Sequence, residues 1–253
     1  MANTKKSKEE TVMCNSALKT SLCSLVFVAA SVAQAEPTAT AINVSIASSV
    51  QQCMGTLVDV TGASSDERGL ACLAASQAVQ LLGRCQIALR GPLHVIVSDE
   101  LRHPSGWPTL GFFEAKRERV TVAGYEKMRS LTKGTPFDAL SKQELFKSVI
   151  VHEVIHGVLH QNSTSHVLSH PAGEYLAYAL QMESLPAHER DSYLRLIDKK
   201  VDTADMLFSD LLLLADPFLF AAQAYAHFKA APDSCAQAKA MLQGEVAFIS
   251  SSF

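Results

Sequence analysis

The segment SKQELFKSVIVHEVIHGVLH, residues 141–160, constrains this chain more than any other, because a helix is the only regular structure that fits its pattern. Apolar residues recur every three or four positions, which is the spacing of one helix face. Ser141 and Glu144 form a capping-box pattern, in which each side chain binds the backbone N–H of the other residue. We therefore expect a long helix, largely buried, that begins next to Ser141.

The same helix carries the pattern His-Glu-x-x-His at residues 152–156. His152 and His156 are four residues apart, so their side chains lie on one face, one turn from each other. Two imidazoles placed in this way can bind one Zn²⁺, and Glu153 lies about 100° round the helix, where it can reach a water molecule on the metal. The alternative is a buried helix whose histidines are satisfied by core hydrogen bonds. A capped helix that follows a predicted hairpin favours the zinc site.

A catalytic zinc site needs a third protein ligand and one open position. His160 lies a further turn along the same helix, and three ligands spread over about 12 Å are too far apart for one ion. Glu174 begins a new helix after a loop long enough to let that helix pack antiparallel to the first. A carboxylate in a first helical turn also faces the favourable end of the helix dipole. We predict Glu174 as the third ligand; the other downstream candidates are His166, His170, Glu183 and His188.

Strand patterns precede this helix, and helical patterns follow it. Apolar, β-branched residues predict a strand at 93–99, and FFEAKRERVTVAGY indicates a hairpin. Because strands and helices do not alternate, the fold class is predicted as α+β. We expect a small mixed β-sheet with its hairpin packed on the His-Glu-x-x-His helix, and a mostly helical C-terminal half. The remaining helices are expected at 67–84, 170–183, 189–230 with a break near Pro217, and 234–243.

The segments HEVIH and GEYLAYALQ resemble the gluzincin branch of the zinc metallopeptidases. The resemblance implies a zincin-like fold in which His152, His156 and Glu174 bind zinc. It implies that Glu153 is the general base that polarises water. It also implies that the edge strand of the preceding sheet holds an extended peptide beside the metal. The resemblance covers the two helices, whereas the strands before them match only in outline.

Two positions depart from related patterns. Many gluzincins carry an acidic residue one turn after the ligand glutamate, where it orients the first histidine, and here that position is Tyr178. A phenol can still form a hydrogen bond, so the orienting group is altered rather than absent. The metzincin pattern fails, because Asn162 stands where that pattern has a histidine. The resemblance therefore supports zinc more strongly than it supports proteolysis.

A hydrolytic transition state needs a hydrogen-bond donor for its oxyanion besides the metal. Tyr178 lies on the same helix face as Glu174, and His227 lies on a predicted C-terminal helix that could close the far side of a cleft. We predict these two residues as catalytic, alongside Glu153. Tyr175 and Tyr225 are further candidates for the same role.

The first 35 residues have the pattern of a signal peptide, in which lysines precede the apolar run 22–33 and cleavage falls near Ala35. The apolar run is too short to span a bilayer, which needs about 20 residues. The residues before Cys23 do not form a lipid-attachment pattern, so we expect an exported protein, periplasmic or secreted, with no stable membrane anchor. Residues 36–253 are expected to form a single zincin-like metallohydrolase domain.

The cysteines support export. Four of them, Cys53, Cys72, Cys85 and Cys235, follow the predicted cleavage site, and an even number in an exported chain predicts two disulfides. Cys72 and Cys85 lie on one predicted helix about 20 Å apart, too far to bond. Two pairings remain, and we favour Cys53 with Cys72 and Cys85 with Cys235 over the crossed alternative.

The net charge limits the classes of molecule that the protein is expected to bind. The whole chain carries a formal charge of −3, and residues 1–35 hold more basic than acidic side chains. The remaining surface is therefore mildly acidic, which argues against nucleic acid, since binding nucleic acid calls for a basic patch. We expect a peptide or protein substrate instead.

Together these patterns predict an exported zinc-dependent hydrolase, a metallopeptidase with Glu153 as general base. One alternative is a zinc hydrolase that acts on a non-peptide substrate, for example a cell-envelope amide. The other is a metal-stabilised binding protein without turnover. Glu153 argues against the binding protein, because a purely structural metal site has no use for a base.

Overall fold

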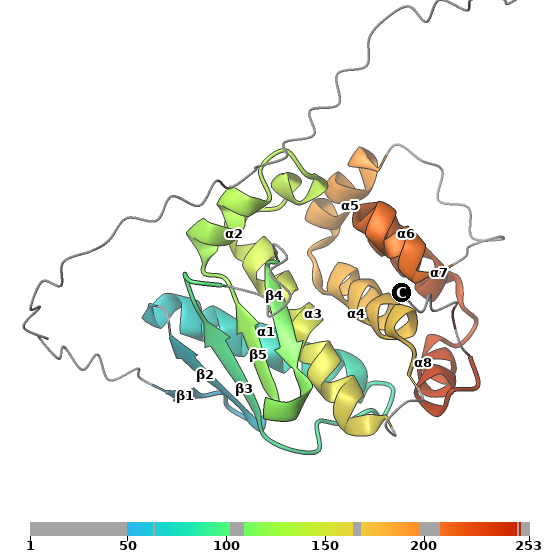
Figure 1. Ribbon diagram of the computed structural model, residues 1–253, viewed down its shortest axis with the longest axis horizontal. Helices are drawn as coiled ribbons and strands as arrows, with labels where there is room; N and C mark the ends of the chain where they lie inside the picture. The colour runs from blue at the N-terminus through green and yellow to red at the C-terminus, as the bar shows by residue number, and fades with distance from the viewer. Residues whose placement is uncertain are drawn as a thin grey trace, which may run out of the picture. The chain divides into compact units, whose positions relative to one another are not determined.

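The computed structural model describes residues 50–62, 64–101, 109–163, 168–197, 208–246 and 248. All of them belong to one compact unit of the chain, Ile46–Phe253. The predicted signal peptide, residues 1–35, lies outside the described residues. Within the compact unit, Figure 1 shows a sheet on one side of a long central helix and a group of shorter helices on the other side.

The sheet has five strands in the order β1-β2-β3-β5-β4. The three inner strands are parallel to one another, whereas β1 and β4 run antiparallel at the two edges, so the sheet is mixed, as predicted. β4 and β5 form the predicted hairpin through a short 3₁₀ turn, and β4 is an edge strand of the described sheet. The strands are β1 (Gln51–Gln52), β2 (Val58–Gly62), β3 (Leu93–Val97), β4 (Gly111–Glu114) and β5 (Arg119–Val122).

The central helix is α3 (Lys142–Asn162), which confirms the strongest sequence prediction. It packs against α1 (Ser65–Gly83), against β4 and β5, and against α4 (His170–Ser184), and most of its side chains are therefore buried. The Ser141 side chain accepts a hydrogen bond from the Glu144 N–H. The Ser141 N–H donates to Glu189 instead of to Glu144, so this half of the predicted capping box is replaced by a contact to a later helix.

The C-terminal half is helical, as predicted, and α4 lies between α3 and α7. The predicted break near Pro217 is present, because α6 ends at Ala215 and Asp216 caps the next helix through the Leu219 N–H. The α+β class is therefore confirmed. The helices besides α1, α3 and α4 are α2 (Tyr125–Leu131), α5 (Ala187–Leu196), α6 (Asp210–Ala215), α7 (Pro217–Ala230) and α8 (Ser234–Gln243), with a 3₁₀ turn η2 (Pro136–Ala139).

Two disulfides tie α1 to the rest of the unit. Cys53 is bonded to Cys72 of α1, and Cys85, two residues after α1, is bonded to Cys235 at the start of α8. This confirms the favoured pairing over the crossed one. Because disulfides persist in oxidising compartments, the pair indicates an extracellular or other oxidising location. Within the described residues, no helix combines the length and the apolar character that crossing a membrane requires.

Candidate metal centre

Three side chains from two neighbouring helices converge on one point. The Nε2 atom of His152 lies 3.1 Å from the Nε2 atom of His156 and 3.5 Å from Oε2 of Glu174. The Nε2 atom of His156 lies 3.3 Å from Oε1 of Glu174. The antiparallel packing of α3 and α4 therefore brings together the three residues that the sequence predicted as ligands.

The spacing of these atoms fits a tetrahedral zinc ion. With bonds of about 2.0–2.1 Å from the metal to nitrogen or oxygen, two ligand atoms of a tetrahedron lie roughly 3.3 Å apart. The two imidazole nitrogens are 3.1 Å apart, and the Glu174 carboxylate has one oxygen 3.3 Å from His156 and the other 3.5 Å from His152, so each separation lies close to that value. Two imidazoles and one carboxylate are also a donor set that catalytic zinc accepts, and they leave a fourth position open.

One part of the reasoning for Glu174 was wrong. Helix α4 begins at His170, so Glu174 is the fifth residue of the helix and lies beyond its first turn. The helix dipole falls off within the first turn, so it contributes little to the position of this carboxylate. Contact with the two histidines of α3 places Glu174 in the cluster.

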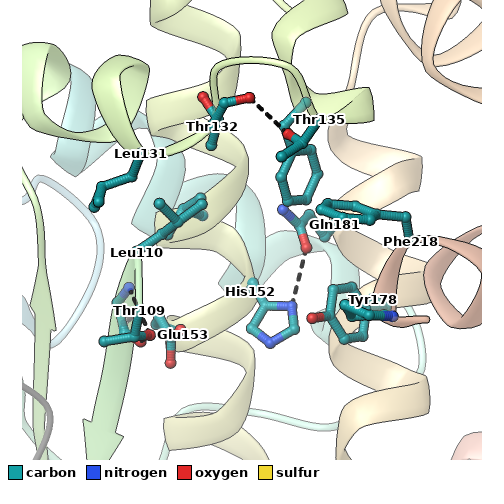
Figure 2. Close-up of a pocket in the computed structure, with 14 residues that line it drawn as sticks. Thr109, Leu110, Leu131, Thr132, Thr135, His152, Glu153, Tyr178, Gln181 and Phe218 are labelled. Carbon is teal, nitrogen blue, oxygen red and sulfur yellow. Dashed lines mark hydrogen bonds between the residues drawn. The ribbon is translucent and has the colours of Figure 1, made fainter. Parts of the chain in front are cut away.

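A hydrogen-bonded chain fixes the orientation of His152. The Ser148 hydroxyl donates to the Leu145 carbonyl, so its oxygen is left to accept from the side-chain amide of Gln181. The amide oxygen of Gln181 then faces Nδ1 of His152 at 3.0 Å (Figure 2). Because an amide oxygen can only accept, Nδ1 carries the hydrogen and Nε2 keeps its lone pair for a metal.

The sequence did not single out Gln181. It predicted Tyr178 as the altered orienting group, whereas the hydrogen bond to His152 comes from one turn further along α4. The available signal was a lone amide on a helix whose other inward residues, such as Leu180 and Met182, are apolar. A buried polar side chain on such a helix requires a partner, and the ring nitrogen of His152 is that partner.

Burial and the neighbouring charges shift the pKa values of Glu174 and Glu153 in opposite directions. Burial would raise the pKa of Glu174, but the charge of His156 and the contacts with both imidazoles hold it well below its usual 4.5. Glu174 is therefore an ionised carboxylate, as a ligand must be. Burial raises the pKa of Glu153, and the charge of Glu174 adds to that rise against the opposing effect of the two histidines. Glu153 is thus the carboxylate with the greater affinity for a proton.

Glu153 lies directly against the first residue of the edge strand. A Cβ atom placed on Gly111 would come within 2.9 Å of Cγ of Glu153 and 2.9 Å of a methyl group of Val122. Only glycine therefore fits at this position without moving Glu153. No pattern in the sequence marks Gly111, because this closeness depends on how α3 packs against β4.

The cluster lies where two hollows meet. A hollow of about 690 Å³ contains His156 and Glu174 and runs beside Phe112 and Phe113 of β4. A second hollow, of about 330 Å³, extends from the cluster toward α2 and the start of α7. Residues that line both hollows are Thr109, Gly111, His152, Glu153 and Tyr178.

Tyr178 lies at the cluster, as predicted. Its ring packs edge-on against His152 with 4.4 Å between ring centroids. Figure 2 shows the Tyr178 hydroxyl on the side of the ring that faces His152. Burial and the charges of Glu174 and Glu153 raise the pKa of Tyr178 above its usual 10. The phenol therefore keeps its hydrogen and can donate it to an anionic oxygen.

His227 is not part of this cluster, so the structure does not support its predicted catalytic role. Its Nδ1 atom accepts a hydrogen bond from the Tyr175 hydroxyl at 2.8 Å, and its ring lines a separate hollow with Asp233 and Gln237. Burial lowers the pKa of His227. The placement of α7 beside α4 sets these contacts, and α7 turns this histidine toward Tyr175 and α8.

The other candidate residues lie outside the cluster. His170 lines the larger hollow and lies 2.6 Å from Asp210 and 3.6 Å from Glu174. Tyr225 lies beneath the Arg190 guanidinium. His160 pairs with Glu118, Glu183 with Arg84 and Lys229, and His188 with Glu189; His166 lies outside the described residues.

A profile for a family of unknown function, DUF6639, matches residues 58–251, which include the whole cluster. The chain belongs to that family. No curated protein and no solved structure matches the chain. Membership of DUF6639 brings no activity with it, so the function must be argued from the site itself.

Proposed function

We propose that this DUF6639 protein is a zinc-dependent hydrolase, and specifically a metallopeptidase of the gluzincin type with a zincin-like fold. One observation carries the proposal. The two imidazole nitrogens of His152 and His156 and the carboxylate of Glu174 converge at separations close to those of a tetrahedral zinc site. Glu153 lies beside them at the meeting point of two hollows. Zn²⁺ is the expected cofactor.

Each residue has a separate task in this proposal. His152, His156 and Glu174 hold the metal. Zinc at this position supplies a Lewis acid, which lowers the pKa of water and polarises a carbonyl oxygen. Glu153 accepts a proton from the attacking water while the water oxygen bonds to the amide carbonyl carbon. The carbon–nitrogen bond then breaks, and Glu153 returns the proton to the leaving nitrogen, so one water yields a carboxylic acid and an amine.

Tyr178 is proposed as the donor to the oxyanion. Its hydroxyl keeps its hydrogen because burial and two nearby carboxylates raise the pKa of the phenol. A neutral donor already in place stabilises charge that develops only in the transition state. Removing one such donor typically costs about 10²- to 10³-fold in rate.

A peptide is the substrate that the sheet favours. β4 is an edge strand of the described sheet, and Phe112, Phe113 and Ala115 on or next to it line the larger hollow. An extended peptide can add to such an edge through backbone hydrogen bonds. The carbonyl of one of its bonds would then lie over the cluster, next to Glu153.

Glu153 distinguishes a catalyst from a metal-stabilised binding protein. It is buried, yet it contributes no atom to the three-residue cluster. A structural site would gain nothing from a second carboxylate, because burying a charge without a partner is costly. A general base requires this position, beside the reacting water and shielded from solvent.

Export is part of the proposal. The sequence pattern of residues 1–35 and the two disulfides support a periplasmic or secreted protein. The mature chain would begin at Glu36, which N-terminal sequencing of protein recovered from outside the cytoplasm can check. A protein that keeps residues 1–35 would contradict cleavage at that point.

The central test is metal content together with peptide hydrolysis. The purified mature protein should contain about one zinc per chain by elemental analysis. It should cleave members of an unbiased peptide library, lose this activity with a chelator and regain it with added zinc. A protein that retains no zinc would refute the proposal, and a zinc-loaded protein that cleaves no peptide would refute the peptidase assignment.

A further inference from the structure

The walls of the smaller hollow are mainly apolar away from the metal cluster. Its outer walls come from Leu131 at the end of α2, Phe137 of η2, Val149 of α3, Phe218 of α7 and Leu110 before β4. We propose that this hollow, called here the apolar pocket, binds a large apolar side chain of the residue next to the cleaved bond. The inference rests on the proposed function and adds a substrate class to it.

The position of the apolar pocket gives it this role. His152, Glu153 and Tyr178 form one end of it, and the same three residues line the hollow that contains the other zinc-binding candidates. Figure 2 shows His152 and Glu153 at one end, and Leu131, Thr132 and Thr135 at the opposite end. A side chain that enters from the cluster therefore belongs to a residue that flanks the reacting carbonyl.

The chemistry of the walls favours an uncharged side chain. Among the described residues that line the apolar pocket, His152, Glu153 and Tyr178 of the proposed catalytic site are the ones with ionisable side chains. The other polar walls are threonines and Gln181, and the Thr132 and Thr135 hydroxyls donate their hydrogens to the carbonyls of Met128 and Thr132. A buried lysine or glutamate of a substrate would find no opposite charge at this end, and burying an unpaired charge is costly.

The size of the apolar pocket favours a large side chain. Its volume is about 330 Å³, which lies at the lower end of the range for ligand-binding pockets, roughly 300–1,000 Å³. An alanine side chain would leave most of it empty, whereas leucine, methionine or phenylalanine could contact several walls. Each buried methylene adds favourable free energy, so affinity should rise with side-chain size until the space is full.

The walls are held in place by contacts of their own. The rings of Phe137 and Phe218 meet edge to face with 5.5 Å between centroids. The buried Tyr193 donates a hydrogen bond to the Phe218 carbonyl at 3.1 Å and packs its ring against Phe137. Because these aromatic walls are already held in place, the pocket does not have to rearrange when a side chain binds, and the fit of that side chain decides its affinity.

The test measures binding, so that it does not depend on turnover. The zinc-loaded Glu153→Gln variant is titrated by calorimetry with peptide hydroxamates that differ in one side chain: glycine, alanine, leucine, phenylalanine, tryptophan, glutamate or lysine. Two series place the varied side chain on the acyl side or on the amine side of the hydroxamate. In one series, leucine and phenylalanine should bind on the order of 10- to 100-fold tighter than glycine. Glutamate and lysine should bind no tighter than glycine.

Two variants of the apolar pocket and one control locate the effect. Leu131 is 41% exposed, so Leu131→Trp is expected to fold and to narrow the pocket, removing most of the gain for phenylalanine. Phe218→Ala widens the pocket and should shift the preference toward a tryptophan side chain. Leu73→Trp changes an exposed leucine of α1 that lines neither hollow, and it should leave all affinities within twofold of the parent.

The outcomes separate this inference from the proposed function. The proposed role of the apolar pocket is wrong if the hydroxamates bind with equal affinity whatever the side chain, or if a charged side chain binds best. Neither result would contradict the zinc site. The same holds if both pocket variants behave like the Leu73→Trp control. A protein that retains no zinc, or that binds no hydroxamate, overturns the proposed function and this inference together.

Discussion

Nδ1 of His152 lies 3.0 Å from the amide oxygen of Gln181, and this contact decides which nitrogen of the imidazole faces the metal position. Gln181 is itself held by Ser148, whose hydroxyl hydrogen is used on the Leu145 carbonyl. The orientation of a candidate zinc ligand is thus set from inside the core.

This contact gives the first prediction. Gln181→Leu should weaken zinc affinity about 10- to 100-fold, because the ring of His152 loses the acceptor that fixes its hydrogen on Nδ1. Gln181→Glu keeps an acceptor in place and should bind zinc within a few-fold of the wild type. Competition with a coloured chelator measures both affinities. Wild-type affinity in Gln181→Leu would mean that the contact does not orient the ligand.

The second prediction separates the two glutamates. Glu153→Gln removes the basicity but keeps the shape, so the variant should hold zinc like the wild type and hydrolyse a peptide 10²- to 10⁴-fold more slowly. Glu174→Gln and His156→Ala each lose a ligand and should lose most of the zinc as well. Metal analysis and kinetics on the same samples show which glutamate is the ligand and which is the base. If Glu153→Gln lost zinc and Glu174→Gln kept it, the two roles would be exchanged.

The third prediction concerns the contact between the edge strand and the general base. Gly111→Ala forces its Cβ to within 2.9 Å of the Glu153 side chain, which must then move. Zinc content should stay unchanged, while activity should fall by about 10²-fold, the typical cost of a 1 Å misplacement. Gly69→Ala is the matched control, since a Cβ on Gly69 meets nothing within 4 Å. Equal activity in the two variants would contradict the proposed position of Glu153.

Local patterns in the sequence predicted α3 and the pair of histidines, because a helix of this length repeats its geometry every turn. The third ligand also followed from chain order, since α4 is the next helix after α3 and packs against it. The favoured disulfide pairing rested on one distance along α1, which local geometry also supplies.

Side chains whose partners depend on packing between distant elements could not be predicted in this way. Gln181 meets His152 because of the register between α4 and α3, and Gly111 meets Glu153 because β4 packs on α3. His227 was placed at the site on the basis of helix content alone. The neighbours of His227 depend on how α7 packs against α4, and the sequence of α7 alone does not predict that packing.

The disulfides give the fourth prediction. Thiol titration of the denatured, non-reduced mature protein should find close to zero free thiols, since all four of its cysteines are paired. Removing the Cys85–Cys235 bond, which closes the longer loop, should cost about 5 kcal/mol of stability, against about 3 kcal/mol for Cys53–Cys72, by the loop-entropy relation. Chemical denaturation of each double-serine variant measures the difference. Four reactive thiols in the denatured, non-reduced protein would contradict both the pairing and the oxidising location.

The fifth prediction concerns pH and the start of α1. Burial would raise the pKa of Glu67, but hydrogen bonds from the N–H groups of Ser64 and Tyr125 and from the Ser64 hydroxyl outweigh it, so the pKa lies below its usual 4.5. A carboxyl group whose pKa is lowered by folding stabilises the protein above its unfolded pKa. That contribution is lost as the pH falls through the folded value.

Glu67→Ala should therefore lower the melting temperature by a few degrees at pH 7, as expected for the loss of a helix cap worth about 1 kcal/mol. The gap between variant and wild type should close as the pH falls below 4.5 and through the lower pKa of folded Glu67, where the carboxyl becomes protonated in the folded protein too. Ser141→Ala removes an uncharged cap from α3 and serves as the control, because its effect should not depend on pH in this way. Melting curves across this pH range measure both gaps. A gap for Glu67→Ala that stayed constant with pH would show that the carboxylate charge does not stabilise α1, and that the contact with the N–H groups of Ser64 and Tyr125 acts through shape alone.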